Sequence, residues 1–313
     1  MSDAITNYEV MDPLFVEPGL PKFNSVSGGQ SSAYVYANYP ANLNMFSLVL
    51  MESRSFTWMN GKDEPTRQKI SDRLGFEFIA TAELDTIIYT ILDLEQTFGI
   101  PISIVSGLTW EALIRQKKGF LPSHSRRFCT STFKVDPIFN ELHKLELLPV
   151  TTRLGFRKGE ESRKQKSMNR IEADGFEYVY NRTTKKPNST YYNRELVKYR
   201  NFEFPLIANG IGPGEVKSFW KDKKVRFASH NNCIGCVNRS PIFLNMMSKL
   251  HPLEYQKFPY LEDYANQIRQ DHNDNSKGTF RHEGTMASFE DPKIDFGLFQ
   301  SDFNDCDSGS CGL

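Results

Sequence analysis

Apolar residues recur along the first half of the chain in two alternating patterns. Segments that suit short strands lie at residues 22–26, 46–51, 101–105 and 148–154, and those at 46–51 and 101–105 are the most apolar. Between these segments, apolar residues return every three or four positions, as in a helix, from about Ser31, over 83–98, around Trp110 and over 137–145. Strands that alternate with helices predict an α/β fold, in which a parallel twisted sheet carries helices on both faces.

The second half of the chain has a weaker pattern. Residues 155–200 are polar and basic with little periodicity, so we expect a mobile or substrate-facing region there. The later apolar positions predict a short strand at 204–207, a helix at 213–221, and helices over 241–270 interrupted at Pro252 and Pro259. From Gln270 onward the chain is rich in Asp, Asn and Gly, which indicates loose order.

These patterns divide the chain into three parts. An N-terminal arm covers residues 1–20, a sheet domain covers 21–240, and a mostly helical region ending in an acidic, cysteine-bearing tail covers 241–313. With 39% hydrophobic and 13% aromatic residues, a chain of 313 residues can bury a core without disulfide bonds. The lack of an 18-residue apolar run and of a basic-then-apolar start predicts a cytoplasmic protein with no membrane partner.

The segment Ser27-Gly28-Gly29-Gln30-Ser31-Ser32 ends the first predicted strand and opens the first predicted helix. Glycines let the backbone turn tightly and expose its N–H groups, and a helix N-terminus adds a partial positive charge. Because ligands of a parallel sheet bind beyond the carboxyl ends of its strands, this turn is a candidate cradle for phosphate or pyrophosphate. It matches neither the Walker-type loop nor the dinucleotide-binding glycine pattern.

The turn resembles the PP-loop, the Ser-Gly-Gly-x-Asp-Ser signature of the ATP pyrophosphatase superfamily, with Ser31 in place of the Asp. Four further segments resemble the phosphoadenylylsulfate (PAPS) reductase-like branch of that superfamily, in the same order along the chain. They are residues 126–137, residues 154–163, residues 204–220 and Asn232-Cys233-Ile234-Gly235-Cys236. The resemblance covers residues 22–240, and the chain is similar to the ATP pyrophosphatase proteins of DNA phosphorothioation systems.

This resemblance implies an adenine nucleotide alpha-hydrolase-like fold and an enzyme that splits ATP, with Mg²⁺, into AMP and pyrophosphate. It assigns cofactor binding to Ser27, Gly28, Gly29, Gln30, Ser31, Ser32, Arg127 and Arg157. It assigns catalytic roles to Ser27, Ser31, Arg157 and Cys129. An arginine suits a phosphate because its guanidinium is planar and always charged.

The resemblance also implies partners. The substrate would be DNA, in phosphorothioate modification and phage defence, adenylated so that sulfur can displace the AMP. A cysteine desulfurase or another sulfur donor would supply the sulfur. A tRNA thiolation enzyme and a non-catalytic nucleotide-binding subunit, in which Ser31 has replaced a catalytic Asp, are alternatives. The oligomeric state stays open between a monomer and a homo-oligomer.

Cysteines are the second candidate for chemistry. Cys233 and Cys236 form a C-x-x-C pair, which suits one edge of a metal site or a redox dithiol. With Cys129 they would supply three thiolates for an iron–sulfur cluster with one open iron, and the resemblance implies a [4Fe-4S] cluster. Adding His230 would complete a Cys₃His zinc site. A third interpretation leaves the thiols without a metal.

The tail residues Ser310-Cys311-Gly312-Leu313 resemble the C-terminal Cys-Gly-Leu of thioredoxin-dependent sulfonucleotide reductases, without the flanking Glu and His. In a reductase of that kind Cys311 would be the nucleophile, and Cys306 could resolve a disulfide with it. Two idle cysteines in a short polar tail are the other interpretation.

The charges are unevenly distributed. The formal net charge of +0 at first argues against a polyanionic partner. However, residues 151–226 hold 18 Lys or Arg against nine Asp or Glu, whereas residues 251–313 hold five against 12. Aromatic residues such as Tyr178 and Tyr180 are interleaved with the basic run. Because basic groups neutralise phosphates and aromatic rings stack on bases, the distribution favours nucleic acid, with DNA preferred to tRNA.

Overall fold

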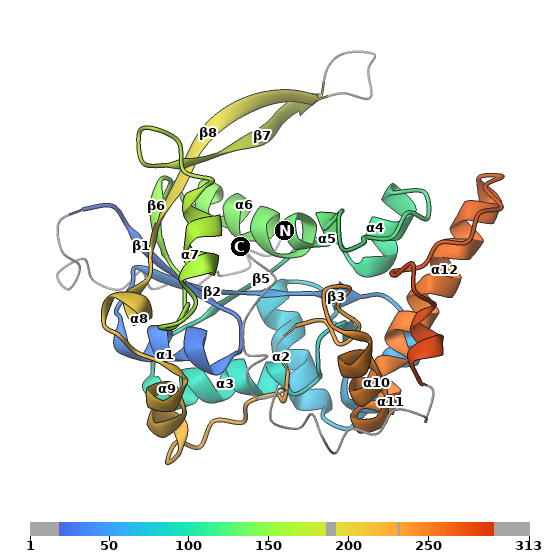
Figure 1. Cartoon of the computed structure of the whole chain (residues 1–313), viewed down its shortest axis with the longest axis horizontal. Helices are drawn as coiled ribbons and strands as arrows, with labels where there is room; N and C mark the ends of the chain where they lie inside the picture. The colour runs from blue at the N-terminus through green and yellow to red at the C-terminus, as the bar shows by residue number, and fades with distance from the viewer. Residues whose placement is uncertain (1–18, 186–191, 231, 291–313) are drawn as a thin grey trace.

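A six-stranded sheet in the order β5-β2-β1-β6-β8-β7 forms the core of the fold (Figure 1). The computed structural model describes residues 19–185, 192–230 and 232–290. The strands are β1 (Lys22–Val26), β2 (Leu43–Leu48), β5 (Ser103–Ser106), β6 (Val150–Arg153), β7 (Glu177–Lys185) and β8 (Tyr192–Glu203). The strands from β5 to β8 run parallel, and β7 is antiparallel to β8. The predicted α/β class is confirmed.

Helices cover both faces of the sheet because successive strand residues point to opposite sides. Phe46 contributes to the hydrophobic cluster under α1 (Gln30–Asn38), α3 (Ile87–Phe98) and α9 (Pro213–Trp220). The preceding residue, Met45, contributes to the cluster under α6 (Asp136–Lys144) on the other face. Both side chains are at most 1% exposed, so the sheet is buried on both sides.

The C-terminal helices share a core with α4 (Trp110–Gln116) and with the small two-stranded sheet of β3 (Leu50–Met51) and β4 (Ala80–Thr81). These helices are α10 (Pro241–Leu250), α11 (Pro252–Tyr255) and α12 (Lys257–Asp271). The indole of Trp110 lies 6.0 Å from the ring centre of Phe258 and 5.4 Å from that of Phe280. This region is therefore packed on the end of the sheet domain, and its helical character is confirmed.

Short elements complete the fold. They are α2 (Glu64–Leu74), α5 (Phe128–Thr130), α7 (Glu161–Met168), α8 (Pro205–Ala208), a π-helical turn (Ser131–Val135) and the 3-10 turns Arg54–Phe56, Trp58–Gly61 and Met286–Glu290. Across the described ranges, no helix has the length and apolar character that crossing a bilayer requires.

Residues 155–207 differ from the expectation in two ways. The described part of residues 155–200 holds α7, β7 and most of β8, so the weak periodicity there does not mean a lack of regular structure, and a substrate-facing role for this region stays a prediction. The strand predicted at 204–207 is the short helix α8, because β8 already ends at Glu203 and Pro205 suits the first position of a helix.

Two expectations for the C-terminal region were also wrong. Helix α12 runs through Pro259, its third residue, because N–H groups in a first turn have no intrahelical acceptor to lose. Residues 272–290 are packed rather than loose, since Phe280 and Met286 are buried. The predicted N-terminal arm up to residue 18 and the tail from residue 291, with Cys306 and Cys311, lie outside the described residues.

Strand β7 and residues 192–199 of β8 form a long hairpin that arches over α6 (Figure 1). Val179 and Val197 pack into the cluster beneath α6 and hold the hairpin down. At its root the Arg200 guanidinium is fully buried, 4.4 Å from the ring centre of Tyr199 and 4.9 Å from that of Phe202. Glu177 Oε2 accepts a hydrogen bond from Arg200 Nε at 2.8 Å.

Because Glu177 compensates a buried guanidinium, Glu177→Gln should lower the free energy of unfolding by about 3–5 kcal/mol. Urea unfolding followed by circular dichroism measures the change. Glu195→Gln, at an exposed position of the same hairpin, is the control and should stay within about 0.5 kcal/mol of the unmodified protein. Equal values for the two variants would contradict the role given to Glu177.

Candidate functional site

Loops from β1 and β6 meet at the point where the strand order reverses. Strand β1 pairs with β2 on one side and with β6 on the other, so the chain builds one half of the sheet and then returns to the other half. Such a switch point leaves a crevice beyond the carboxyl ends of the two central strands. The glycine turn, residues 27–32, follows β1, and Gly155 and Arg157 follow β6.

Gly28 fixes the shape of the glycine turn. Its φ is +75°, and a Cβ at this position would lie 2.4 Å from Ile87 Cδ1, so only glycine fits. Helix α1 follows, and its first helical hydrogen bond joins Ala33 N to Gly29 O at 3.0 Å. The N–H groups of Gln30 and Ser31 precede that bond and therefore have no acceptor within the helix. Trp220 Nε1 donates to Gln30 O at 3.0 Å and holds α9 against this turn.

The hydroxyls of Ser31 and Ser32 have different environments. Ser32 Oγ donates to Gly29 O at 3.0 Å, accepts from Ser27 N at 3.1 Å and lies 2.9 Å from Ser27 Oγ. Ser32 thus stabilises the turn itself. Ser31 is 6% exposed, and its Oγ has no hydrogen-bond partner among the described residues. A buried hydroxyl without a partner costs free energy unless a ligand satisfies it.

Gly155 closes the other side of this crevice. A Cβ on Gly155 would lie 2.8 Å from Ser32 N and 2.9 Å from Ser31 O, so the β6 loop touches the backbone of the first turn of α1. Two residues on, Arg157 is 6% exposed and its Nε lies 3.3 Å from Glu160 Oε2. The structure thus brings the glycine turn and the β6 loop together, as the sequence predicts, with Arg157 held by an acidic neighbour.

The three candidate ligand cysteines line one pocket. Cys129, Cys233 and Cys236 line a small pocket of about 30 Å³ together with Arg127 and Lys134, and we call it the cysteine pocket. Aromatic side chains form much of its remaining wall, from Trp110, Phe133, Phe258 and Phe280. The glycine turn and Arg157 do not line it. Arg127, assigned to phosphate by resemblance, therefore lies with the thiols.

The C-x-x-C segment is fixed by backbone contacts. Cys236 N donates to Cys233 O at 3.0 Å, which closes a turn, and Ile234 N donates to Ala82 O at 3.1 Å, which ties that turn to the end of β4. A Cβ on Gly235 would lie 2.2 Å from Phe258 Cγ, so this glycine is required by close contact with the ring. These contacts position both sulfurs on the wall of the cysteine pocket.

Arg127 is held against the same segment. With the Asn238 amide placed so that its oxygen faces the guanidinium, that oxygen accepts from Arg127 Nε at 2.8 Å and from Nη2 at 3.0 Å. Arg127 thus brings a fixed positive charge to the wall that carries the thiols.

Within the described ranges, no three His, Cys, Asp or Glu side chains converge as a group that could hold a metal ion. His230 does not line the cysteine pocket, and its Nδ1 lies 3.4 Å from Arg239 Nη2. Burial, followed by the charge of Arg239, holds the pKa of His230 well below its usual range. As placed, the described side chains converge neither as a Cys₃His zinc site nor as a three-thiolate cluster site, and both metal assignments of Cys129, Cys233 and Cys236 stay predictions from the sequence.

One short segment connects the glycine turn with the cysteine pocket. Residues 82–87 begin at Ala82, whose carbonyl holds the C-x-x-C turn, and end at Ile87, which contacts Gly28. Between them, the fully buried Glu83 pairs with Lys134 of the pocket wall at 3.3 Å. The sequence does not predict this ion pair, because 51 residues separate its partners and only Lys134 lies in one of the segments that resemble the family.

Comparisons with protein-family models, with curated proteins and with solved structures found no match. The family resemblance therefore rests on the sequence motifs quoted above.

The two serines of the turn should differ in their effect on stability. Ser32→Ala removes the acceptor of Ser27 N and should lower the free energy of unfolding by about 1–3 kcal/mol. Ser31→Ala removes a hydroxyl with no partner and should stay within about 0.5 kcal/mol of the unmodified protein. Urea unfolding of both variants tests this, and a large loss in Ser31→Ala would show that its hydroxyl is already satisfied.

Proposed function

We propose that this chain is an ATP pyrophosphatase that adenylates DNA for sulfur transfer. The observation that carries the proposal is the buried Ser31 hydroxyl, which lacks a partner among the described residues and lies at a helix N-terminus that Gly155 closes from the other side. Backbone N–H groups and a helix dipole at one helix N-terminus, with an unsatisfied hydroxyl beside them, suit an anion such as the pyrophosphate of ATP.

The proposed first step is attack by an oxygen of the DNA phosphodiester on the α-phosphorus of ATP, which releases pyrophosphate. The glycine turn stabilises the charge that develops on pyrophosphate through fixed donors that need no rearrangement. ATP enters as its Mg²⁺ complex, which offsets part of the same charge. Arg157 lies on the β6 side of the crevice, where its guanidinium, shared with Glu160, can turn toward a phosphate.

The proposed second step takes place at the cysteine pocket. A persulfide on one of its thiols attacks the activated phosphorus of DNA through its outer sulfur, and AMP leaves with the oxygen that it had activated. A second thiol of the pocket then attacks the inner sulfur, which releases the phosphorothioate and leaves a Cys–Cys disulfide that an external thiol reductant, such as a thioredoxin-type protein, reduces. A nearby cation stabilises a thiolate, the reactive form of cysteine, and Arg127 supplies that charge beside Cys129. A cysteine desulfurase or another donor would reload the sulfur. No step of this scheme passes through a metal cluster.

Replacing Ser31 should reduce pyrophosphate release without unfolding the protein. With MgATP and duplex DNA, Ser31→Ala should release pyrophosphate at least about tenfold more slowly, because a donor to the leaving group is lost. Ser218→Ala, at an exposed position of α9, is the matched control and should keep the full rate. A coupled assay for inorganic pyrophosphate measures both, and no release with DNA or tRNA would overturn the proposal.

The cysteine pocket should matter for sulfur transfer and not for ATP cleavage. With a cysteine desulfurase and [³⁵S]cysteine, Cys129→Ser and Cys233→Ser should lose incorporation of sulfur into DNA while retaining pyrophosphate release. Cys311→Ser is the control and should retain both, whereas a selective loss in that variant would favour the reductase alternative. Iron, sulfide and zinc analysis after anaerobic purification tests the cluster prediction separately.

A further inference from the structure

A second, larger cavity lies beneath the hairpin. Its open volume is about 1540 Å³, and its walls come from the hairpin, the start of α6, the end of α4 and the loop after β5. The side chains that face it are mostly polar, and we call it the chamber. They include Lys117, Asn140, Asn181 and Arg194. Lys117, Asn140 and Arg194 are exposed to solvent, so they are accessible to a ligand.

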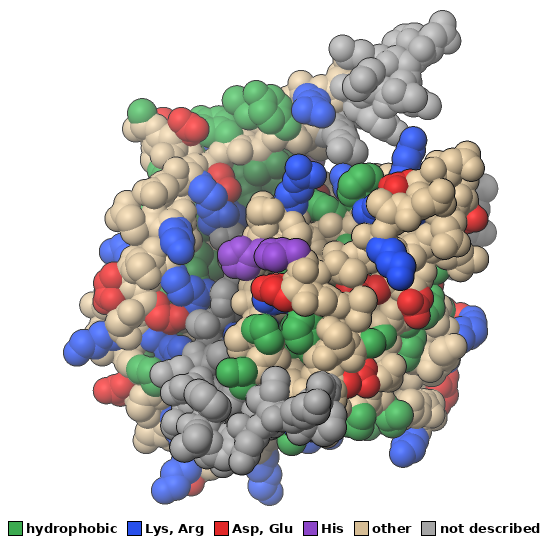
Figure 2. Space-filling view, turned by 45° about the vertical axis from the view of Figure 1, so that its right-hand side comes forward, with side chains coloured by type: hydrophobic (Ala, Val, Ile, Leu, Met, Phe, Trp, Pro, Cys, Tyr) green, Lys and Arg blue, Asp and Glu red, His purple; other side chains and the backbone are tan. Residues whose placement is uncertain are grey.

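The outer face of the hairpin, opposite the face of Val179 and Val197, carries an exposed aromatic ring at the rim of the chamber. Tyr180 is 64% exposed and lies opposite Leu196, which is 53% exposed, on the neighbouring strand. Figure 2 shows hydrophobic side chains gathered on the hairpin with a basic side chain beside them. Solvent exposure of a tyrosine and a leucine on one short surface indicates a binding surface, and rings of this kind stack on nucleic-acid bases.

The chamber and the cysteine pocket lie on the two sides of one wall. The segment 128–135 contributes Thr132 to the chamber and Thr130 and Phe133 to the pocket. Its position is fixed, because a Cβ on Gly107 would lie 2.3 Å from Thr132 O and Ser47 Oγ donates to Phe133 O at 2.6 Å. Ser106 and Gly107 of the chamber also end β5, so the chamber opens at the same edge of the sheet as the glycine turn.

We propose that the chamber binds a single nucleic-acid strand as it approaches the cysteine pocket. Lys117 and Arg194 would neutralise backbone phosphates, Tyr180 would stack on a base, and the amides of Asn140 and Asn181 would contact base edges. Asp136, the acidic residue of the chamber, would accept from an exocyclic amine or a sugar hydroxyl. The link to sulfur chemistry rests on the proposed function, whereas the binding itself does not.

The size of the chamber favours an unpaired strand. A double helix, whose major groove alone is about 12 Å wide, does not fit in the interior of the chamber, which has a volume of about 710 Å³, but an unpaired nucleotide does. Enzymes that modify one nucleotide of a duplex commonly extrude it from the stack. We therefore expect the chamber to hold the extruded or unpaired part of the DNA, with the duplex outside it.

Binding without ATP tests the proposal directly. The probe is a fluorescein-labelled 12-nucleotide single-stranded DNA, with affinity measured by anisotropy at several salt concentrations. The double variant Lys117→Glu/Arg194→Glu should bind at least about tenfold more weakly, and its salt slope should fall by about 1.4, the value for two lost phosphate contacts. Tyr180→Ala should weaken binding about fivefold or more through lost stacking.

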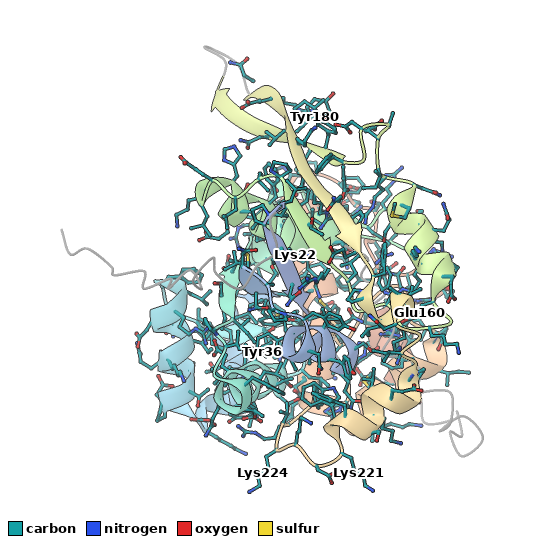
Figure 3. The ribbon with its side chains drawn as sticks, turned by 90° about the vertical axis from the view of Figure 1, so that its left-hand side faces the viewer. Lys22, Tyr36, Glu160, Tyr180, Lys221 and Lys224 are labelled. Atoms are coloured by element: carbon teal, nitrogen blue, oxygen red, sulfur yellow. The ribbon has the colours of Figure 1, made fainter. Side chains whose placement is uncertain are left out.

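The matched control is Lys221→Glu/Lys224→Glu. These exposed lysines lie at the end of the molecule opposite Tyr180 (Figure 3), and the double variant makes the same change in net charge. The control should bind like the unmodified protein, and thermal unfolding should show that all variants remain folded. Equal weakening in the control would show that binding depends on net charge and not on the chamber, and it would overturn the proposal. Unchanged binding in the chamber variants would overturn it as well.

Crosslinking supplies a readout that does not depend on any variant. A 4-thiothymidine oligonucleotide irradiated on the unmodified protein should label peptides from the hairpin or from residues 106–117, and labelling confined to other segments would overturn the proposal. Pyrophosphate release is measured in parallel. Chamber binding without ATP cleavage would refute the proposed function alone, and ATP cleavage without chamber binding would refute this inference alone.

Discussion

The close contact between Gly155 and the first turn of α1 is the constraint on which the site depends. Two parallel strands can place their loops at one edge of a sheet, but only a residue without a side chain lets the β6 loop touch the backbone of Ser31 and Ser32. Position 28, on the other side, also requires glycine, because Ile87 leaves no room for a Cβ there. The crevice is therefore formed by backbone atoms, whose N–H groups are fixed before any ligand arrives.

Residues 82–87 extend this constraint to the cysteine pocket. One end of the segment accepts from the backbone of the C-x-x-C turn, and the other end lies over Gly28. In its middle, a fully buried Glu83 would be costly without Lys134, and Lys134 belongs to the pocket wall. The two halves of the proposed chemistry thus share one rigid connection.

Sequence analysis predicted the sheet, the glycine turn and the shared placement of the three cysteines, because short motifs and apolar periods are local signals. It did not predict α2, because most residues of this helix are polar and give no apolar period. The signals that could have identified it are those of helix ends: Asp63 before the helix, Pro65 in its first turn and Gly75 after it. It predicted a strand at 204–207 because a run of four apolar residues is compatible with both a strand and one turn of helix. The hairpin and the Glu83–Lys134 pair depend on long-range packing, which no local pattern encodes.

The wall between the chamber and the cysteine pocket has a thermodynamic consequence. Because segment 128–135 contributes side chains to both cavities, any shift of that segment that favours an occupant on one side changes the affinity on the other. Thermodynamic linkage requires this coupling to be reciprocal. If a bound nucleic-acid strand stabilises the sulfur-loaded form of a pocket thiol, then loading of that thiol must raise the affinity of the chamber for the strand by the same factor. A single peptide segment can therefore make the binding of either ligand favour the binding of the other.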